Sequence, residues 1–464
     1  MKNIITRLFQ SVPYPIKIVF ATIQGFKLNY WRKFQREKYL QEIVVRDDWS
    51  KKQIEDWQQE ALEKMLDHAV ATVPHYRELW SEIIKDKPGL SHRDLLNWPI
   101  LEKTTVKSNP ERFISEQYKG KKMFPMSTSG TSGTPMNFLL DREALSIWYA
   151  LYEHRIKRWN GVSDQDRWAN VGGQLICRID QKKPPFWVWN MPMKQLYLSS
   201  YHITSSNVGY YLNALKSHKI QYLLGYVSSI YSIVSIGTSQ NLEFPKLKLI
   251  ITNAEPLFQH QRQAISKAFS CPVIQTYSGC EFAFGGNEDL SGTMYLWPEA
   301  GVMEVVDEDG QVLPEGKVGN FVITGLINKA MPLIRYRLGD SGAIAPEDVS
   351  RSKNYPALQE ITGRNDDLVY TIDGKLVGRL DPVFKGDFHI KEAQIIQERL
   401  DYIRVIIVPF ATYSQVEGDE IIRRLKERVG SKTVVVLELT ESIPRAANGK
   451  FKAVISHVKR TELI

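Results

Sequence analysis

A run of nine small residues at positions 127–135 offers the clearest chemistry in the sequence: Ser-Thr-Ser-Gly-Thr-Ser-Gly-Thr-Pro. Such residues bury little side chain, but they expose backbone N–H groups and hydroxyls, and their glycines let a ligand come close. A polyphosphate needs these groups from a protein. Because no Lys follows Gly133, the run is not a phosphate loop of the Walker type.

The same composition is also typical of flexible linkers. Two details favour a phosphate loop. The run is short and lies inside a region that looks folded, between Met126 and the apolar stretch 138–140. It also repeats the triplet Ser-Gly-Thr, a regularity that a linker does not need. We therefore predict that residues 127–134 bind phosphate.

Length and composition place the chain among globular proteins. Its 464 residues exceed one ordinary core and predict two or more domains. The hydrophobic content of 43% and the charged content of 24% are those of a soluble protein. Three scattered cysteines, Cys177, Cys271 and Cys280, provide neither a disulfide framework nor a zinc site and suit a reducing cytosol.

Positive charge gathers at the N-terminus. Residues 1–38 hold eight Lys and Arg side chains and one acid, Glu37, interleaved with aromatic and aliphatic residues. No apolar run approaches the roughly 20 residues of a membrane span. Two interpretations stay open. One is a helical arm packed on the body with its basic face solvated, and the other is peripheral attachment to an anionic membrane surface. No segment matches a nucleic-acid-binding module, so no nucleic acid is expected.

Hydrophobic periodicity gives the expected elements. Helices are predicted over residues 47–86, broken at Val73-Pro74, and over 142–160. Strands at 222–226 and 247–252 alternate with helices at 207–217 and 256–269, which predicts an α/β layered fold. Segments 302–306 and 319–324 suggest an antiparallel sheet after that core. A final block has an α+β pattern, with strand 403–408, helix 418–428 and strand 433–439.

Five further motifs follow the small-residue run, at positions 252–257, 277–281, 335–340, 363–367 and 444–450. The ordered series resembles the adenylate-forming superfamily of acyl-CoA synthetases and peptide-synthetase adenylation domains. Within it, the chain looks most like the phenylacetate-CoA ligase branch and its CapK-like proteins of surface-polysaccharide synthesis. Three features point to that branch. They are the residue order of the small-residue run, the pair Glu255-Pro256, and the late region with Asp373-Gly374 and residues 394–397.

The resemblance implies a large multi-layer domain of α/β sheets with a small antiparallel β subdomain, followed by a smaller mobile α+β domain. We expect a basic amphipathic N-terminal arm over residues 1–45, the large domain over 46–362 and the small domain over 363–464, with a hinge at Asp366.

In this superfamily a carboxylate attacks the α-phosphate of ATP, and a nucleophile then takes the acyl group from acyl-AMP. By resemblance, Lys450 would bridge carboxylate and α-phosphate, Glu281 would hold Mg²⁺, Arg364 would contact the nucleotide, and Asp340 would accept both ribose hydroxyls. Lys452 competes with Lys450 for its role. The expected nucleotide-binding residues are Ser127, Thr128, Ser129, Gly130, Thr131, Ser132, Gly133, Thr134, Asn253, Ala254, Glu255, Tyr277, Ser278 and Asp340.

The acid would lie in a pocket of aromatic and small residues that the sequence does not define further. The expected members are Phe282, Ala283, Phe284, Gly285, Gly286, Tyr226 and Trp168. ATP and Mg²⁺ are the expected cofactors and zinc is not expected, because the stretch after the tyrosine motif lacks Cys and His ligands. The acceptor stays open between coenzyme A, an amine and a sugar hydroxyl.

The expected protein is an AMP-forming ligase of capsule, exopolysaccharide or O-antigen synthesis, cytoplasmic or at the inner face of the membrane. The alternatives are a catabolic aryl-CoA ligase and a non-catalytic protein of polysaccharide assembly that kept the fold. Retention of Lys450, Asp340 and Glu281 argues against the last, because a protein without catalysis is free to lose them.

Overall fold

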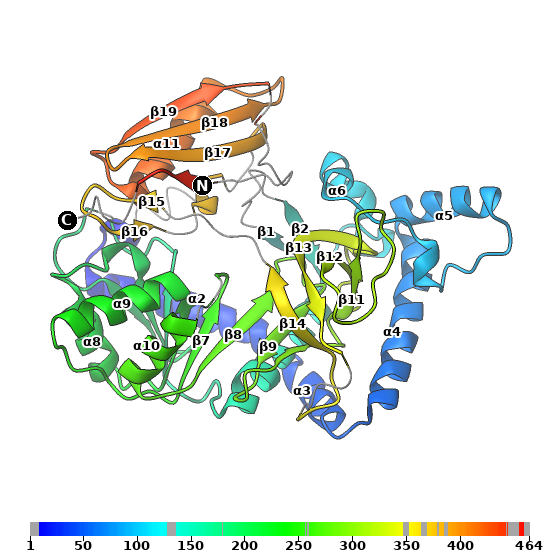
Figure 1. Cartoon of the computed structure of the whole chain (residues 1–464), viewed down its shortest axis with the longest axis horizontal. Helices are drawn as coiled ribbons and strands as arrows, with labels where there is room; N and C mark the ends of the chain where they lie inside the picture. Colours follow the sequence, from blue (N-terminus) through cyan, green and yellow to red (C-terminus); the bar gives the residue numbers. More distant parts are fainter. Residues whose placement is uncertain are drawn as a thin grey trace.

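The computed structural model describes residues 9–127, 136–178, 180–255, 257, 259–346, 352–362, 369–377, 380–384, 388–441, 443 and 454–458. Figure 1 shows a large body built around a 12-stranded sheet and, above it, a small body with a four-stranded sheet. Both bodies combine helices with sheets, so the predicted α/β class is confirmed.

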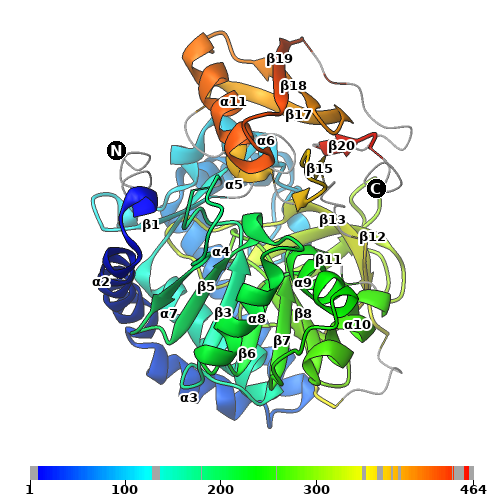
Figure 2. The same cartoon turned by 90° about the vertical axis from the view of Figure 1, so that its left-hand side faces the viewer.

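The parallel half of the large sheet runs in the order β8-β7-β6-β3-β5, with β4 antiparallel at the edge. The bounds are β8 (Val273–Ser278), β7 (Leu249–Asn253), β6 (Tyr222–Tyr226), β3 (Trp168–Gly172), β5 (Gln195–Ser199) and β4 (Trp187–Asn190). Figure 2 shows α8 (Val208–Ser217), α9 (Val227–Ser239) and α10 (Gln259–Phe269) over one face. Buried side chains such as Ala169, Val171 and Leu223 pack against those helices. The predicted alternation of strands and helices is confirmed.

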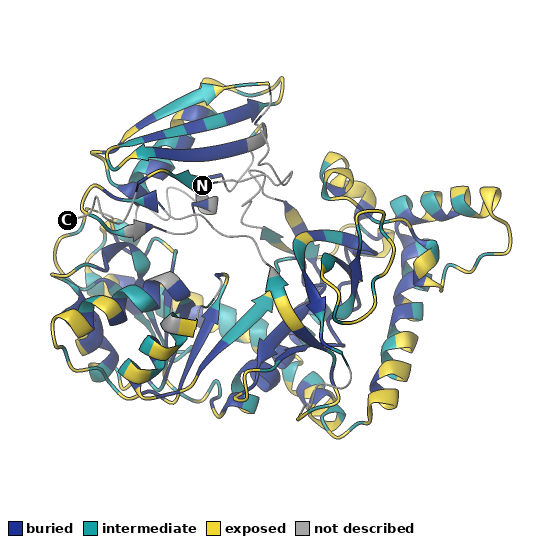
Figure 3. Ribbon diagram, in the orientation of Figure 1, coloured by how far each residue is buried: buried dark blue, intermediate teal, exposed yellow. Residues whose placement is uncertain are grey.

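The antiparallel half continues through β9, β10, β14, β13, β12 and β11. Their bounds are β9 (Gly285–Glu288), β10 (Met294–Leu296), β14 (Ala357–Thr362), β13 (Tyr336–Ile344), β12 (Gly319–Gly325) and β11 (Gly301–Val306). Beside it stand α4 (Lys51–Thr72) and α5 (Pro74–Asp86), which separate at Pro74 as the sequence predicts. Figure 3 shows buried strands at the centre and exposed outer faces on α4 and α5. A short hairpin joins β1 (Phe124–Ser127) to β2 (Asn137–Leu140).

The N-terminal segment forms α2 (Tyr14–Lys33) and α3 (Arg36–Arg46), which pack on α7 (Arg142–Leu151), while α2 also contacts β4. A helical arm packed on the body is one of the two interpretations that the sequence leaves open, and that interpretation places a basic face in solvent. The outward face of α2 is mainly apolar, and Lys17 is buried. Among the described residues, no helix combines the length and the apolar character that crossing a bilayer requires.

The small body contains four strands in the order β19-β18-β17-β20 and the helix α11 (Gln415–Val429). The strands are β17 (Ile390–Arg399), β18 (Tyr402–Pro409), β19 (Val434–Leu439) and β20 (Val454–Ser456). Its core also includes Tyr201 of the large body. Figure 1 places it above the ends of the parallel strands. The expected hinge, Asp366, lies outside the described residues.

Candidate functional site

Three predicted segments meet where parallel strands end. Asn253 is the last residue of β7 and pairs in register with Tyr226, the last residue of β6. The next strand, β8, ends at Ser278 and leads into Glu281. The carboxyl edge of an open parallel sheet is where such folds bind ligands. The expected site residues of these three segments therefore lie along one edge of the sheet.

A hydrogen bond joins two of the motifs across 63 residues of sequence. The hydroxyl of Tyr277 donates to Oδ2 of Asp340 over 2.9 Å. Asp340 lies in a bulge of β13, where the pairing with β12 shifts between Asn320 and Val322. Gly339 provides the left-handed backbone of that bulge, with φ 88°. The bulge brings the carboxylate of Asp340 to the tyrosine.

The carboxylate of Glu281 folds back over Gly279. Glu281 is 8% exposed, and a Cβ atom at position 279 would lie 2.0 Å from its Oε2. Even alanine at 279 would therefore displace this carboxylate. The following residue, Phe282, has a left-handed backbone with φ 53°. Such strained residues gather at ligand sites.

The segment after β7 provides an acceptor without a partner. Oδ1 of Asn253 is buried, and no described residue donates a hydrogen bond to it. A buried acceptor is costly unless a ligand or water pairs with it, and the amino group of adenine is a suitable donor. The next residue, Ala254, is also left-handed, with φ 64°. The residues present thus fit an adenine base along this segment.

Several expected site residues lie outside the described residues. These are Thr128, Ser129, Gly130, Thr131, Ser132, Gly133, Thr134, Arg364, Asp366, Lys450 and the competing Lys452. The structure does describe both ends of the phosphate run. Ser127 ends β1 and its hydroxyl donates to Oδ1 of Asn137, the first residue of β2, over 2.5 Å. The run therefore connects the two strands of the β1–β2 hairpin.

A cavity of about 1220 Å³ lies between α2 and the side of the sheet that faces away from α8 and α9. Of the predicted pocket residues, Phe282 and Trp168 line it. The other five do not. Ala283 and Phe284 are buried in the packed core. The two glycines are enclosed by neighbours: a Cβ atom at Gly285 would lie 2.2 Å from the Trp297 ring, and one at Gly286 would lie 2.8 Å from the carbonyl oxygen of Tyr295. Tyr226 lies beside Gly173.

Sequence reasoning missed most of the cavity wall, which includes Asn170, Tyr197, Tyr222 and Leu224. The sequence of β3 did contain a pattern that indicates a second face. Trp168 and Asn170 alternate with the core residues Ala169 and Val171, which is the period of a strand with two different faces. The alternation identifies a second face, but not the helix that lies over it.

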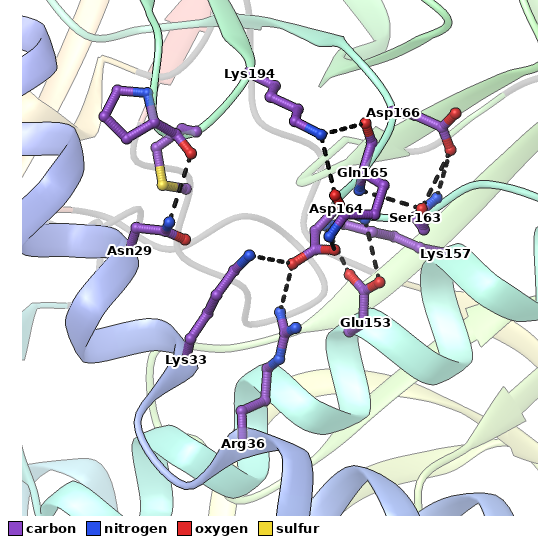
Figure 4. Close-up of polar contacts among 12 residues, drawn as sticks. Asn29, Lys33, Arg36, Glu153, Lys157, Ser163, Asp164, Gln165, Asp166 and Lys194 are labelled. Carbon is purple, nitrogen blue, oxygen red and sulfur yellow. Dashed lines mark hydrogen bonds and ion pairs between the residues drawn. The ribbon is translucent and has the colours of Figure 1, made fainter.

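Several residues that line the cavity are charged, and Figure 4 shows the polar contacts among them. Lys33 and Arg36 contact Oδ2 of Asp164 at 2.8 and 3.0 Å. Burial alone would raise the pKa of Asp164, but these two cations lower it to about 2. Nζ of Lys157 lies 3.1 Å from the buried Glu153, and burial lowers the pKa of Lys157. Both residues belong to a π-helical turn, Tyr152–Lys157, a feature frequent at functional sites.

Comparison with known proteins gives consistent similarities. Residues 369–457 match the family model of the CapK C-terminal domain. Protein CapK of Staphylococcus aureus is 27% identical over 97% of this chain and 98% of its own length. The phenylacetate-coenzyme A ligase of Thermus thermophilus is 27% identical over 45% of this chain and 54% of its own. A crystal structure of 2-hydroxyisobutyryl-CoA ligase with 2-HIB-AMP and CoA shares the fold, with a TM-score of 0.56 and 20% identity over 88% of this chain and 90% of that one.

Proposed function

Since this chain belongs to the adenylate-forming superfamily and is an AMP-forming ligase, we propose that it activates a carboxylic acid for surface-polysaccharide synthesis. A carboxylate oxygen attacks the α-phosphorus of ATP, the bond to the bridging oxygen breaks, and pyrophosphate leaves. A nucleophile of the acceptor then attacks the acyl carbon, and AMP leaves with the bonding electrons.

The contact between Tyr277 and Asp340 is the observation that carries the proposal. It holds an aromatic ring and a carboxylate side by side at the edge where Asn253 presents its unpaired oxygen. The ring would flank adenine, Asn253 would accept from its amino group, and Asp340 would accept from the ribose hydroxyls. Lys450 would supply the cation between carboxylate and α-phosphate as negative charge develops there, and Asp366 would be the hinge on which the small domain turns.

Glu281 is the proposed protein ligand for Mg²⁺. Magnesium usually takes one or two carboxylates and completes its shell with substrate phosphates and water. Its positive charge would reduce repulsion between the phosphates and the incoming carboxylate. The described residues contain no cluster of three His, Cys, Asp or Glu side chains for a metal, so phosphate oxygens would complete this site.

Replacing Gly279 with alanine tests the position of Glu281. The added methyl group would overlap Oε2 of Glu281, so the Mg²⁺ concentration for half-maximal activity should rise about 10- to 100-fold, as for other perturbed metal ligands. Magnesium titrations of pyrophosphate exchange measure this change. Gly209→Ala on α8 is the matched control, because the nearest atom to its added Cβ is Leu242 Cδ1 at 3.9 Å. An unchanged magnesium dependence would contradict the proposal that Glu281 binds Mg²⁺.

The acceptor and pathway are the finer part of the proposal. Similarity to Protein CapK over 97% of this chain supports a role in capsule or related polysaccharide synthesis. There the acyl group would pass to an amine or hydroxyl of a sugar, or first to coenzyme A. The similarity to a phenylacetate-coenzyme A ligase supports the second candidate, a catabolic aryl-CoA ligase.

Exchange of pyrophosphate into ATP tests adenylation directly. A panel of aryl acids, fatty acids, amino acids and uronic acids is offered with ATP and Mg²⁺. We expect exchange with one class of acid, and the consumption of its acyl-adenylate by CoA or by sugar amines then identifies the acceptor. If no acid supports exchange, the alternative of a non-catalytic assembly protein replaces the ligase.

The N-terminal helices are proposed to lie on an anionic membrane surface. Six apolar side chains at helical spacing are exposed on the outward face of α2: Ile16, Val19, Phe20, Ile23, Phe26 and Tyr30. Cations stand at its end, where Lys122 and Arg142 lie over the Trp31 ring at 4.1 and 4.8 Å. An apolar face bordered by aromatic rings and cations suits the interface of a bilayer with acidic headgroups.

Vesicle sedimentation tests this surface. The double change Val19→Ser and Phe26→Ser removes two exposed apolar side chains, each contributing about 1.5–3 kcal/mol when fully buried, so binding should fall by 100-fold or more. Val416→Ser with Leu439→Ser changes two exposed apolar side chains on the small body and should have no effect. Wild-type protein should pellet with anionic vesicles and release at high salt. Equal pelleting of both variants would contradict the membrane surface, and self-association through the same face would appear as a dimer without lipid.

A further inference from the structure

The cavity under α2 is larger than a small acid requires. Its volume of about 1220 Å³ exceeds the ≈ 300–1000 Å³ of pockets for drug-sized ligands. The wall alternates aromatic and aliphatic side chains with amides, including Trp148, Trp168, Asn170, Tyr197 and Leu224. Such a lining suits a mostly apolar ligand that carries a few polar groups.

The mouth of the cavity coincides with the exposed apolar face of α2. Phe20 and Ile23 line the cavity, yet they are 53% and 63% exposed. They therefore form the rim between the interior and the outer surface. A ligand that enters past these side chains comes from the side proposed to face lipid, so an apolar chain need not cross water.

The inner end of the cavity adjoins the proposed reaction site. Met126 lines it and directly precedes Ser127, where the phosphate run begins. Phe282 lines it and directly follows Glu281. A chain lying in the cavity can therefore extend from the edge of the nucleotide site toward α2.

A polar group lies on the wall of the cavity. Oη of Tyr222 is buried, and no described residue hydrogen-bonds to it. The Tyr222 ring stacks on Trp168 with centroids 5.8 Å apart, and Nζ of Lys157 lies 6.0 Å from the Tyr222 ring. A buried hydroxyl of this kind points to a partner that comes with the ligand.

We propose that this cavity binds the apolar chain of the acid that the enzyme activates, and that this acid is a long-chain amphiphile drawn from the lipid surface beside α2. The inference rests on the proposed ligase function. The carboxyl end would lie near Met126 and Phe282, and a polar substituent along the chain would pair with Tyr222. The substrate class is thus a lipid-soluble carboxylic acid.

Calorimetric titration of the full-length protein with straight-chain acids, without ATP, is the test. Affinity should rise with chain length from butyrate to laurate by up to about fourfold per methylene, the fold-change that corresponds to about 0.8 kcal/mol per buried CH₂. Ala21→Phe adds a ring to α2 on the cavity side and should weaken laurate binding at least tenfold. Val416→Phe adds bulk at an exposed position of α11, outside the cavity lining, and should leave laurate binding unchanged.

Each outcome decides a separate point. Affinity that does not depend on chain length, or equal effects of the two variants, would overturn the cavity assignment. The wild-type chain-length series tests the cavity even if Ala21→Phe fails to fold. Chain-length-dependent binding without pyrophosphate exchange for any acid would overturn the ligase while the cavity stands. Pyrophosphate exchange with short acids only, without laurate binding, would overturn the cavity assignment while the ligase function stands.

Discussion

Replacing Asp340 with alanine should lower kcat/KM for ATP by roughly two to four powers of ten. The two ribose hydroxyls would each lose a hydrogen bond to this carboxylate. A hydrogen bond to a charged group contributes about 1.5–3 kcal/mol. The change should leave the fold intact, because Asp340 lies in a bulge of β13 and not in regular pairing. Initial rates of pyrophosphate exchange against ATP concentration measure the effect.

Tyr277→Phe is the control for this experiment. It would keep the ring that we propose to flank adenine and would remove the 2.9 Å hydrogen bond to Asp340, so we expect a loss of about tenfold or less. If both variants lose the same activity, Asp340 acts only by positioning Tyr277. If neither loses activity, the nucleotide lies elsewhere and the proposed site is wrong.

Removal of the Asp47 carboxylate should destabilise the protein by about 1–3 kcal/mol, the usual cost of leaving buried hydrogen-bond donors without their acceptor. The buried Arg155 keeps its partner Glu299 at 2.6 Å. Asp47 accepts hydrogen bonds from His154 at 2.7 Å, Trp159 at 2.8 Å and Tyr355 at 3.0 Å, and Nη1 of the fully buried Arg155 lies 4.0 Å away. These contacts join the end of α3 to the π-helical turn and to the segment before β14. Chemical denaturation of Asp47→Ala measures the change in the unfolding midpoint.

The acid dependence of this effect has a definite sign. Burial alone would raise the pKa of Asp47, but the hydrogen bonds from His154 and Trp159 outweigh it and hold the pKa below its ordinary value of 3.8. The stabilisation is therefore complete above that value and is lost as pH falls through the lower folded-state pKa. The difference between wild type and Asp47→Ala should shrink below about pH 4. Asp48→Ala, on the exposed neighbour, should change neither quantity, and an equal effect would contradict a specific role for Asp47.

Much of the framework could be predicted because it rests on local patterns. The strand at Tyr222–Tyr226 and the helices α8, α10 and α11 follow apolar periodicity, and the structure places them within a few residues of their predicted bounds. The approach of the segments after β7 and β8 follows from adjacent parallel strands. The contact of Tyr277 with Asp340 could not be predicted, because it depends on a bulge that shifts the register of β13.

The sequence left the orientation of α2 open for a similar reason. Apolar residues occur on several faces of this helix, so its periodicity does not select which one is buried. Close packing selects it instead: a Cβ at Gly25 would lie 2.0 Å from Oδ1 of Asn190 on β4. The cavity escaped prediction because its walls come from residues as distant in sequence as Ala21 and Tyr222.

The positions of α2 and of the small body have a consequence for turnover. The cavity is lined by α2, which Figure 2 shows along one side of the large body, whereas the small body stands over the carboxyl ends of the parallel strands. On the proposals that α2 lies on lipid and that the small body turns about a hinge, this rotation can proceed while α2 keeps its contact with the membrane. ATP would arrive from water and the acid from the bilayer, each by its own route. The enzyme would then act as a phase-transfer catalyst, joining reactants of opposite solubility at the boundary between their solvents.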